Sequence, residues 1–343
     1  MRGSFGMRSD QITIEAAIIH IMDGKVGMPV LSDEEIELDS DLCEFLKGHI
    51  EKFTESDDVK KCVFEEDSFA GKILEHCRRE NFAEVSRQLC GRLYKLMNAN
   101  PDIPSGDVAA LLFRKEGIRY FGFLKMNYKT SYTHQTQATD LGGNTNGIVL
   151  QRALLPSKTQ KLSEAFAVDL EKKEILLTEK RYEINGVKKD YFSEMFLECH
   201  GPMSQKTKLE LVTRAVEQVN RKYFGDEDTE RKMEVKNVFY QELEEEGQLQ
   251  VERVTEKLFS ASPEMRADFT EKMEKYQMTQ SVVEPKSQQT LKKFQTQKLT
   301  TEEGIEITIP MEAYGNPEKV EFITNGDGTI SVLIKNIGHL QSK

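Results

Sequence analysis

Residues 105–126, SGDVAALLFRKEGIRYFGFLKM, contain two apolar runs on either side of the turn candidate Lys115-Glu116-Gly117. Strand-forming residues that flank a short glycine-containing turn are typical of a β-hairpin. Later runs of similar composition predict further strands at 148–155, 164–170 and 174–184. The centre of the sequence therefore predicts a meander of antiparallel strands.

The residues before this hairpin change from a strand pattern to helical patterns. The run ITIEAAIIHIM, which begins at Ile12, predicts a strand that forms a hairpin with Met28 to Leu31. Apolar residues at helical spacing then predict three helices, near 40–53, 68–79 and 82–97. We therefore expect an α+β domain with a mostly antiparallel sheet over residues 8–188, in which the Thr-, Asn- and Gly-rich stretch 135–147 is a mobile loop.

Residues 189–280 carry a helical pattern. Within this region, apolar residues three and four positions apart form one packed helix face: Leu209, Val212, Val216, Val219 and Tyr223. The pair Ser262-Pro263 predicts the start of another helix. Residues 281–301 have few apolar side chains and are expected to be a linker, which leads to a small C-terminal β hairpin unit over 302–343.

Composition limits the classes of protein to which the chain can belong. The 47 Lys and Arg residues against 58 Asp and Glu give a net charge of −11 at pH 7, which excludes a uniformly basic coat for nucleic acid. No stretch approaches the roughly 18 apolar residues of a membrane span, so we expect a soluble protein with no membrane partner. Five cysteines without CxxC spacing favour reduced thiols in the cytoplasm. Residues 1–7 are expected to be an expression leader, with Met7 as a natural start.

The sequence lacks the motifs of common enzyme and metal sites. The adjacent pairs His76-Cys77 and Cys199-His200 do not have the spacing of zinc ligands. Neither GxSxG, GxGxxG nor a Walker lysine occurs, and no pattern of carboxylates suggests a Mg²⁺ site for cleaving phosphodiesters. We therefore expect no catalytic residues, no metal and no cofactor.

Two segments carry cations without neighbouring acids, and such local patches can bind DNA even on an acidic protein. Between residues 117 and 139 there is no Asp or Glu, while the cations Arg119, Lys125 and Lys129 alternate with aromatic residues. The second segment, 286–299, also lacks acids and contains Lys286, Lys292, Lys293 and Lys298. The alternatives that stay open are a core strand with a solvated edge for the first segment and a soluble linker for the second.

Strand alternation gives the first segment a definite geometry. It places Arg119 and Lys125 on the same face as two phenylalanines, opposite a face made of Tyr120, Leu124 and Met126. Because the latter is the better core face, we expect the face of Arg119, Phe121, Phe123 and Lys125 to point outward, where its two cations could contact phosphates.

Several phrases along the chain match a known family in the same order. They include ITIEAAIIHIMDGKVGMPVLSD, DLCEFLKGHIEKF, VFEEDSFAGKIL, SGDVAALLFRKEGIRYFGFLKMNYKTSY, YFSEMFLEC and the terminal KVEFITNGDGTISVLIKN. Together these phrases resemble the bacterial nucleoid-associated protein NdpA (YejK-like) family over nearly the whole chain, from about Ser9 to Asn336. The resemblance lies in ordered phrases and not in a catalytic signature.

This resemblance implies a cytoplasmic, nucleoid-located protein that binds double-stranded DNA with little sequence preference and works with chromosome-topology enzymes. It implies no enzymatic activity and transfers no set of binding residues. The rival hypothesis is a protein-interaction adaptor that a partner protein recruits to the nucleoid, through the acidic helices after Asp226. Self-association into a homodimer is left open by the sequence.

Overall fold

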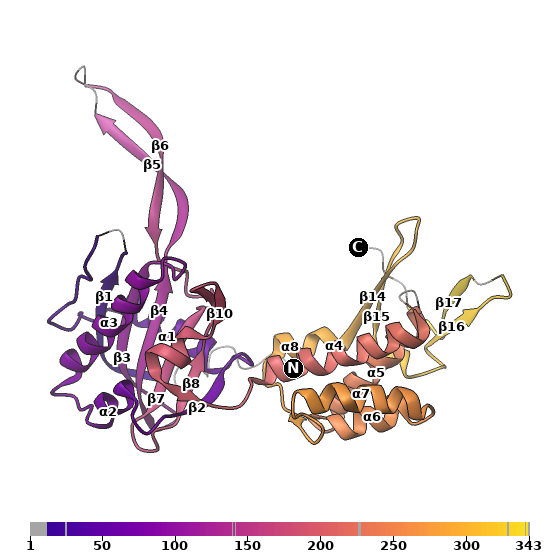
Figure 1. The fold of residues 1–343 in the computed structure, drawn as a ribbon. Helices are drawn as coiled ribbons and strands as arrows, with labels where there is room; N and C mark the ends of the chain where they lie inside the picture. The colour runs from indigo at the N-terminus through magenta and orange to yellow at the C-terminus, as the bar shows by residue number, and fades with distance from the viewer. Residues whose placement is uncertain are drawn as a thin grey trace. The chain divides into compact units, whose positions relative to one another are not determined.

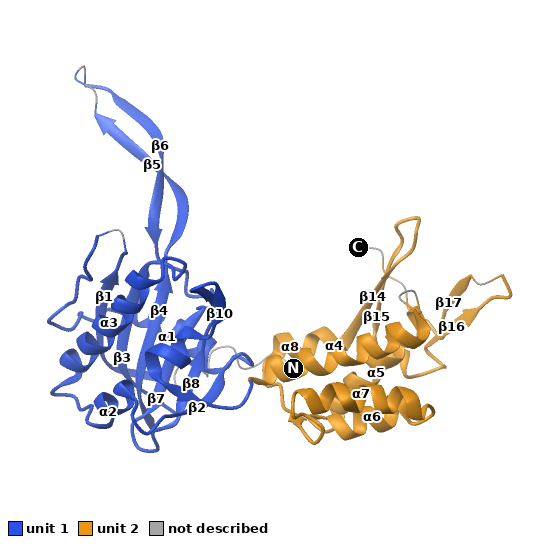
Figure 2. Ribbon diagram, in the orientation of Figure 1, with its two compact units in different colours: residues 1–203 blue, residues 204–343 orange. Residues whose placement is uncertain are grey.

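The computed structural model describes residues 12–24, 26–138, 140, 142–225, 228–327, 329–339 and 341. The expected leader, residues 1–7, lies outside these residues. The chain folds into two compact units, Met1–Met203 and Ser204–Lys343 (Figure 2). Each unit has its own arrangement of helices and strands, which together give the α+β class that the sequence predicts.

A seven-stranded sheet forms the centre of the first unit, and each strand is antiparallel to its neighbours (Figure 1). The order across the sheet is β1 (Ile12–Met22), β3 (Gly106–Lys115), β4 (Ile118–Asn127), β7 (Glu164–Asp169), β8 (Ile175–Thr178), β2 (Lys60–Phe64) and β11 (Cys199–His200). The predicted central hairpin is confirmed: β3 and β4 are joined by the two residues Glu116 and Gly117. Both have positive φ angles, 53° and 83°, as a tight hairpin turn requires.

Helices cover both faces of this sheet. On one face, α1 (Ser40–Thr54) packs Leu46, Ile50 and Phe53 against residues of β3 and β4 that include Leu124 and Met126. On the other face, the core contains residues of α2 (Phe69–Glu75), α3 (Phe82–Ala99) and the π-helix η2 (Phe192–Leu197). The expectation that Phe121 and Phe123 point to solvent is therefore wrong, because both are fully buried in this second layer.

The first strand differs from its predicted pairing. β1 pairs along its length with β3, whereas the expected partner Met28 to Leu31 contributes only the isolated bridge between Ile21 and Val30. β3 pairs with β1 over all its residues from Gly106 to Lys115, and the four residues Met28 to Leu31 are too few to form as many backbone hydrogen bonds. Asn185 and Gly186, which follow the predicted strand 174–184, form the turn between β9 (Tyr182–Ile184) and β10 (Val187–Lys189).

A long two-stranded ribbon is inserted between β4 and β7. Its strands are β5 (Lys129–Ala138) and β6 (Asn144–Leu154), which pair with each other and project from the sheet (Figure 1). The expected loop 135–147 therefore contains strand residues on both sides of the tip. After the ribbon the chain enters β7, which pairs with β4. The ribbon therefore takes the place of the loop between two neighbouring antiparallel strands.

The second unit begins with four helices, α4 (Gln205–Phe224), α5 (Thr229–Glu245), α6 (Val251–Phe259) and α7 (Pro263–Lys275). The predicted helix face in α4 is buried at Leu209, Val212, Val216 and Val219, and Ser262 caps α7 before the proline at its first turn. Two short strands, β12 (Leu249–Gln250) and β13 (Val282–Val283), pair beside these helices.

The remaining elements are α8 (Gln288–Gln295), the hairpin β14 (Thr296–Thr300) and β15 (Glu306–Pro310), α9 (Met311–Tyr314), and the hairpin β16 (Val320–Thr324) and β17 (Ile330–Ile334). The expected linker 281–301 thus contains a helix and a strand. Leu299 and Ile307 of the first hairpin pack with Met233 of α5, so the C-terminal strands share a small core with the helices.

The cysteines are all free thiols. Cys77, which follows the end of α2, and Cys90, on the inner side of α3, are both buried. Burial raises the pKa of the Cys77 thiol to about 11. These two thiols therefore act as small apolar groups of the core.

Truncation after residue 188 should unfold the first unit, because η2 completes its core. The Phe196 ring lies 5.5 Å from that of Phe123, and the Phe192 ring lies 6.0 Å from that of Phe166. Loss of a buried phenylalanine costs about 3–5 kcal/mol, so losing both is comparable with the whole stability of a typical domain. Residues 8–203 should unfold cooperatively in urea, followed by circular dichroism, and residues 8–188 should not. Equal midpoints for the two fragments would contradict this assignment of the core.

Candidate nucleic-acid interface

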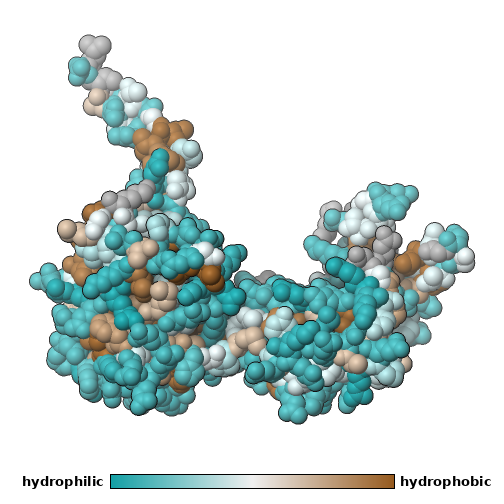
Figure 3. Space-filling view, viewed as in Figure 1, coloured by the Kyte–Doolittle hydropathy of each residue, from teal (hydrophilic) through white to brown (hydrophobic). Residues whose placement is uncertain are grey.

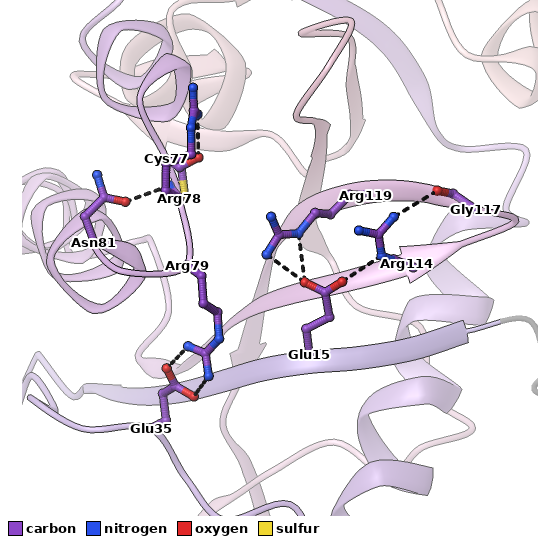
Figure 4. Close-up of polar contacts among 9 residues, drawn as sticks. All are labelled: Glu15, Glu35, Cys77, Arg78, Arg79, Asn81, Arg114, Gly117 and Arg119. Atoms are coloured by element: carbon purple, nitrogen blue, oxygen red, sulfur yellow. Dashed lines mark hydrogen bonds and ion pairs between the residues drawn. The ribbon is translucent and has the colours of Figure 1, made fainter.

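Arg119 lies in β4 and is held by a carboxylate. Its guanidinium donates to Glu15 of β1, with Nε to Oε2 at 2.8 Å, and Arg114 of β3 donates to the other oxygen at 2.7 Å (Figure 4). Partial burial opposes ionisation of Glu15, but the two arginine hydrogen bonds outweigh it and lower its pKa. The three side chains tie neighbouring strands together, and Glu15 engages two of the three guanidinium nitrogens of Arg119, Nε and Nη2.

The loop between α2 and α3 adds two more arginines to this region (Figure 4). Arg79 pairs with Glu35 through its two terminal guanidinium nitrogens, Nη1 and Nη2. Arg78 donates to the carbonyl of Cys77 at 2.8 Å, while the side chain of Asn81 accepts from the Arg78 backbone N–H. These contacts hold the loop, so the arginines at this end of the sheet have structural partners.

Lys125 does not point outward as the alternation pattern predicts; its side chain is 0% exposed. Nζ donates to the carbonyl oxygen of Pro104 at 3.0 Å and to Oδ1 of Asn127, and it lies 3.8 Å from Oε2 of Glu164. The physical reason is the second helical layer, which covers the face that Lys125 shares with Phe123. A phosphate cannot reach an ammonium group enclosed in this way.

A buried polar network surrounds Lys125. Asn127 donates to Glu164 at 2.7 Å, and Glu164 is itself fully buried at the start of β7. Burial lowers the pKa of Lys125 to about 8, while the attraction of Glu164 acts in the opposite direction. The network lies where β4 leaves the sheet to enter the ribbon, so its hydrogen bonds hold the base of β5 and β6.

Lys129 is exposed at the start of β5, opposite Leu154. Arg119, Lys125 and Lys129 thus occupy three different environments: an ion pair, the core and the base of the ribbon. The structure does not gather them into one basic patch.

Three lysines of the second predicted segment lie on two elements that follow each other in the chain. Lys292 and Lys293 lie on α8 and Lys298 lies on β14, all exposed, and we call these three residues the lysine strip. None of the three forms an ion pair or hydrogen bond through its side chain with a residue that the structure describes. Lys286 is also exposed, shortly before α8.

Local packing explains the orientation of the lysine strip. The Phe294 ring of α8 lies 5.7 Å from that of Phe239 in α5, which turns this side of α8 toward the helices. Lys292 and Lys293 therefore face solvent. In the hairpin, Lys298 lies opposite Thr308, and the acid Glu306 lies opposite Thr300.

One cation near the strip escaped the sequence pattern. Lys236 of α5 donates to Oε1 of Gln297 at 2.9 Å, which places it on the face of β14 opposite that of Lys298. Burial lowers the pKa of Lys236. Its helix carries many acids in sequence, so only the pairing of α5 with α8 and β14 reveals this position.

The acidic run at the end of α5, residues 242–246, is only partly exposed to solvent. Glu242 is buried and its Oε1 lies 2.8 Å from Nζ of Lys257 on α6, with Arg253 at 3.7 Å from the other oxygen. This carboxylate joins two helices. Glu244, Glu245 and Glu246 remain exposed.

The described part of the chain offers neither a metal site nor a membrane-spanning helix. Among the residues that the structure describes, no group of three or more His, Cys, Asp and Glu side chains is placed to hold a metal ion. In the same part of the chain, no helix has the length and apolar character needed to cross a membrane.

The buried ammonium of Lys125 predicts a pH dependence of stability. Its pKa is about 8 in the folded protein and 10.5 in the unfolded chain, so the unfolded state binds more protons between these values. The free energy of unfolding should therefore rise from pH 8 to 10.5, by roughly 3 kcal/mol at about 1.4 kcal/mol per pH unit. Lys125→Met combined with Glu164→Gln should remove this rise in urea titrations. Lys95→Met, an exposed control, should keep it, and equal profiles for all three proteins would contradict the burial of charge.

Comparison with known protein families gives a match. The family model described as nucleoid-associated protein YejK matches residues 18–340. No curated protein matches the chain. Because the family match runs through both units, the chain belongs to the family of nucleoid-associated proteins that this model describes.

Proposed function

We propose that the protein binds double-stranded DNA directly, without sequence preference and without catalysing a reaction, through the lysine strip. The observation that carries this proposal is the presence of three exposed lysines on adjacent elements without an acidic partner among the described residues. Phosphate contacts of this kind carry no sequence information, so they support binding to any duplex.

The negative net charge does not oppose such binding at short range. At physiological salt the screening length is about 8 Å, so a phosphate at the strip responds mainly to charges nearby. Nonspecific binding then requires only a local excess of cations. Segment 285–301 supplies that excess, because it contains four lysines and no Asp or Glu.

The environments of the other candidates favour the strip. Arg119 is engaged by Glu15 and Lys125 is enclosed, whereas the strip lysines need not break an ion pair or leave the core. Removing a buried charge from its partners would carry a large free-energy cost. Arg119 and Lys129 stay a predicted second site that the same experiment can test.

The salt dependence of DNA affinity tests the proposal. Each neutralised phosphate contributes about −0.9 to the slope of log affinity against log salt, so the three lysines of the strip predict a slope of roughly −3. Replacing Lys292, Lys293 and Lys298 by Gln should flatten this slope by up to about 2.7 and weaken mixed-sequence duplexes alike. Electrophoretic shifts over a salt series measure both quantities.

A matched control separates the strip from net charge. Lys61, Lys95 and Lys172 are exposed lysines of the first unit, and changing them to Gln alters the net charge by the same amount. This control should keep the wild-type slope. Equal losses in both triple variants would contradict the strip as the site, and a loss confined to Arg119→Gln with Lys129→Gln would move the site to the first unit.

Absence of any shift by the wild-type protein at low salt would overturn direct binding. In that case the adaptor hypothesis takes its place, with the exposed acids Glu244 to Glu246 as the surface for a basic partner. The chromosome-topology enzymes that the family resemblance implies would be the first partners to test.

A further inference from the structure

The β5–β6 ribbon has no cover on either face. Its strands pair only with each other, and all residues except the half-buried Val149 are exposed. An isolated two-stranded hairpin is at best marginally stable in water. A ribbon of this length is therefore expected to gain order by contact with another surface.

The two faces of the ribbon differ in chemistry. Cross-strand pairing places Tyr132 opposite Leu150 and His134 opposite Ile148 on one face, where Tyr132 is 72% and Ile148 is 78% exposed. Figure 3 shows apolar colour gathered on the ribbon. The other face is mainly polar and uncharged, with pairs such as Ser131 and Gln151. We call the face of Tyr132, His134, Ile148 and Leu150 the apolar face. Exposed apolar surface of this kind marks interaction sites.

The charges of the ribbon indicate what covers this face. Lys129 and Arg152 lie near its base and Asp140 lies at its tip, with no Asp, Glu, Lys or Arg at 130–138 or 144–151 between them. Two identical ribbons stacked in antiparallel directions would bring the cationic base of each beside the acidic tip of the other. No charge would be buried at the centre of the contact.

We propose that the apolar face of the ribbon is a self-association surface, which packs against the same face of a second copy of the chain in antiparallel orientation. The contact is isologous, so it closes as a dimer and does not extend into a filament. Tyr132 of one copy then lies near Ile148 of the other, as in the packing of two sheets about 10 Å apart.

The size of the ribbon limits the strength of this contact. Ten residues per strand at about 3.3 Å each, across two strands about 4.8 Å apart, give a face of roughly 30 by 10 Å. Two such faces bury about 600 Å², less than the 1,200 Å² of a standard stable interface. The dimer should therefore dissociate on dilution through the micromolar range.

DNA is the less suitable occupant of this face. The tip of the ribbon carries the acid Asp140, which a phosphate backbone would repel, and the apolar face offers few donors to phosphate oxygens. Only Lys129 and Arg152 at the base carry full positive charge. The lysine strip belongs to a different unit, so self-association and DNA contact can be measured separately.

Sedimentation velocity of the full chain without DNA, over a dilution series, tests the proposal. The wild-type protein should shift from dimer to monomer, and Tyr132→Ser with Ile148→Thr should raise the dissociation constant at least tenfold. Val149→Thr, on the opposite face of the same strand, should leave the constant unchanged. Far-ultraviolet circular dichroism checks that each variant is folded. A wild-type protein that stays monomeric at every concentration would overturn the proposal.

A charge exchange tests the antiparallel orientation. Asp140→Arg alone should weaken the dimer severalfold at low salt, because it places the new arginine at the tip of one copy beside Lys129 and Arg152 at the base of the other. Adding Arg152→Asp should restore the wild-type dissociation constant. Failure of the second change to restore the dimer would contradict the antiparallel arrangement. If the Tyr132 and Ile148 variant keeps the wild-type dissociation constant but loses DNA affinity, the ribbon is a DNA arm and the self-association surface is wrong.

Discussion

Burial of the β3–β4 hairpin on both faces is the constraint on which the first unit depends. Ala109, Leu111 and Leu124 face one helical layer, while Ala110, Leu112 and Phe123 face the other. Because the central residues of these strands are buried on both faces, β1 and β7 must pair at their edges and helices must cover both faces. The same burial encloses Lys125. The free-energy cost of burying its charge is reduced by its contacts with Pro104 and Glu164.

The sequence was informative where the pattern is local. The tight turn of the central hairpin, the buried face of α4 and the proline at the start of α7 follow from turn chemistry, helical spacing and capping. The pairing of β1 with β3 is not local, since it joins residues that lie about a hundred positions apart in the chain. The apolar run nearest to β1 in the sequence, Met28 to Leu31, is therefore not its main partner.

The candidate site was harder to predict because charge patterns do not report burial. The continuous apolar run from Val108 to Phe113 already indicates a strand covered on both sides, and applying that signal to β4 would have placed Lys125 inside. The polar composition of the ribbon suggested a loop, because Thr, Gln and Asn are frequent in both loops and exposed strands. In segment 281–301, alternation at Gln297 and Leu299 was too short to distinguish a strand from a linker.

An acidic protein with a small basic feature gains most from having two copies of that feature in one assembly. If the strip binds DNA as proposed, its three lysines would make few phosphate contacts, so a single chain would leave DNA readily when salt is raised. When two chains are joined, the second strip meets DNA at an effective concentration set by the first, which increases retention without a new contact. The same arrangement lets two duplex segments be held together. A weak, reversible ribbon contact suits this role, since local accumulation on DNA would favour the dimer and release would favour the monomer.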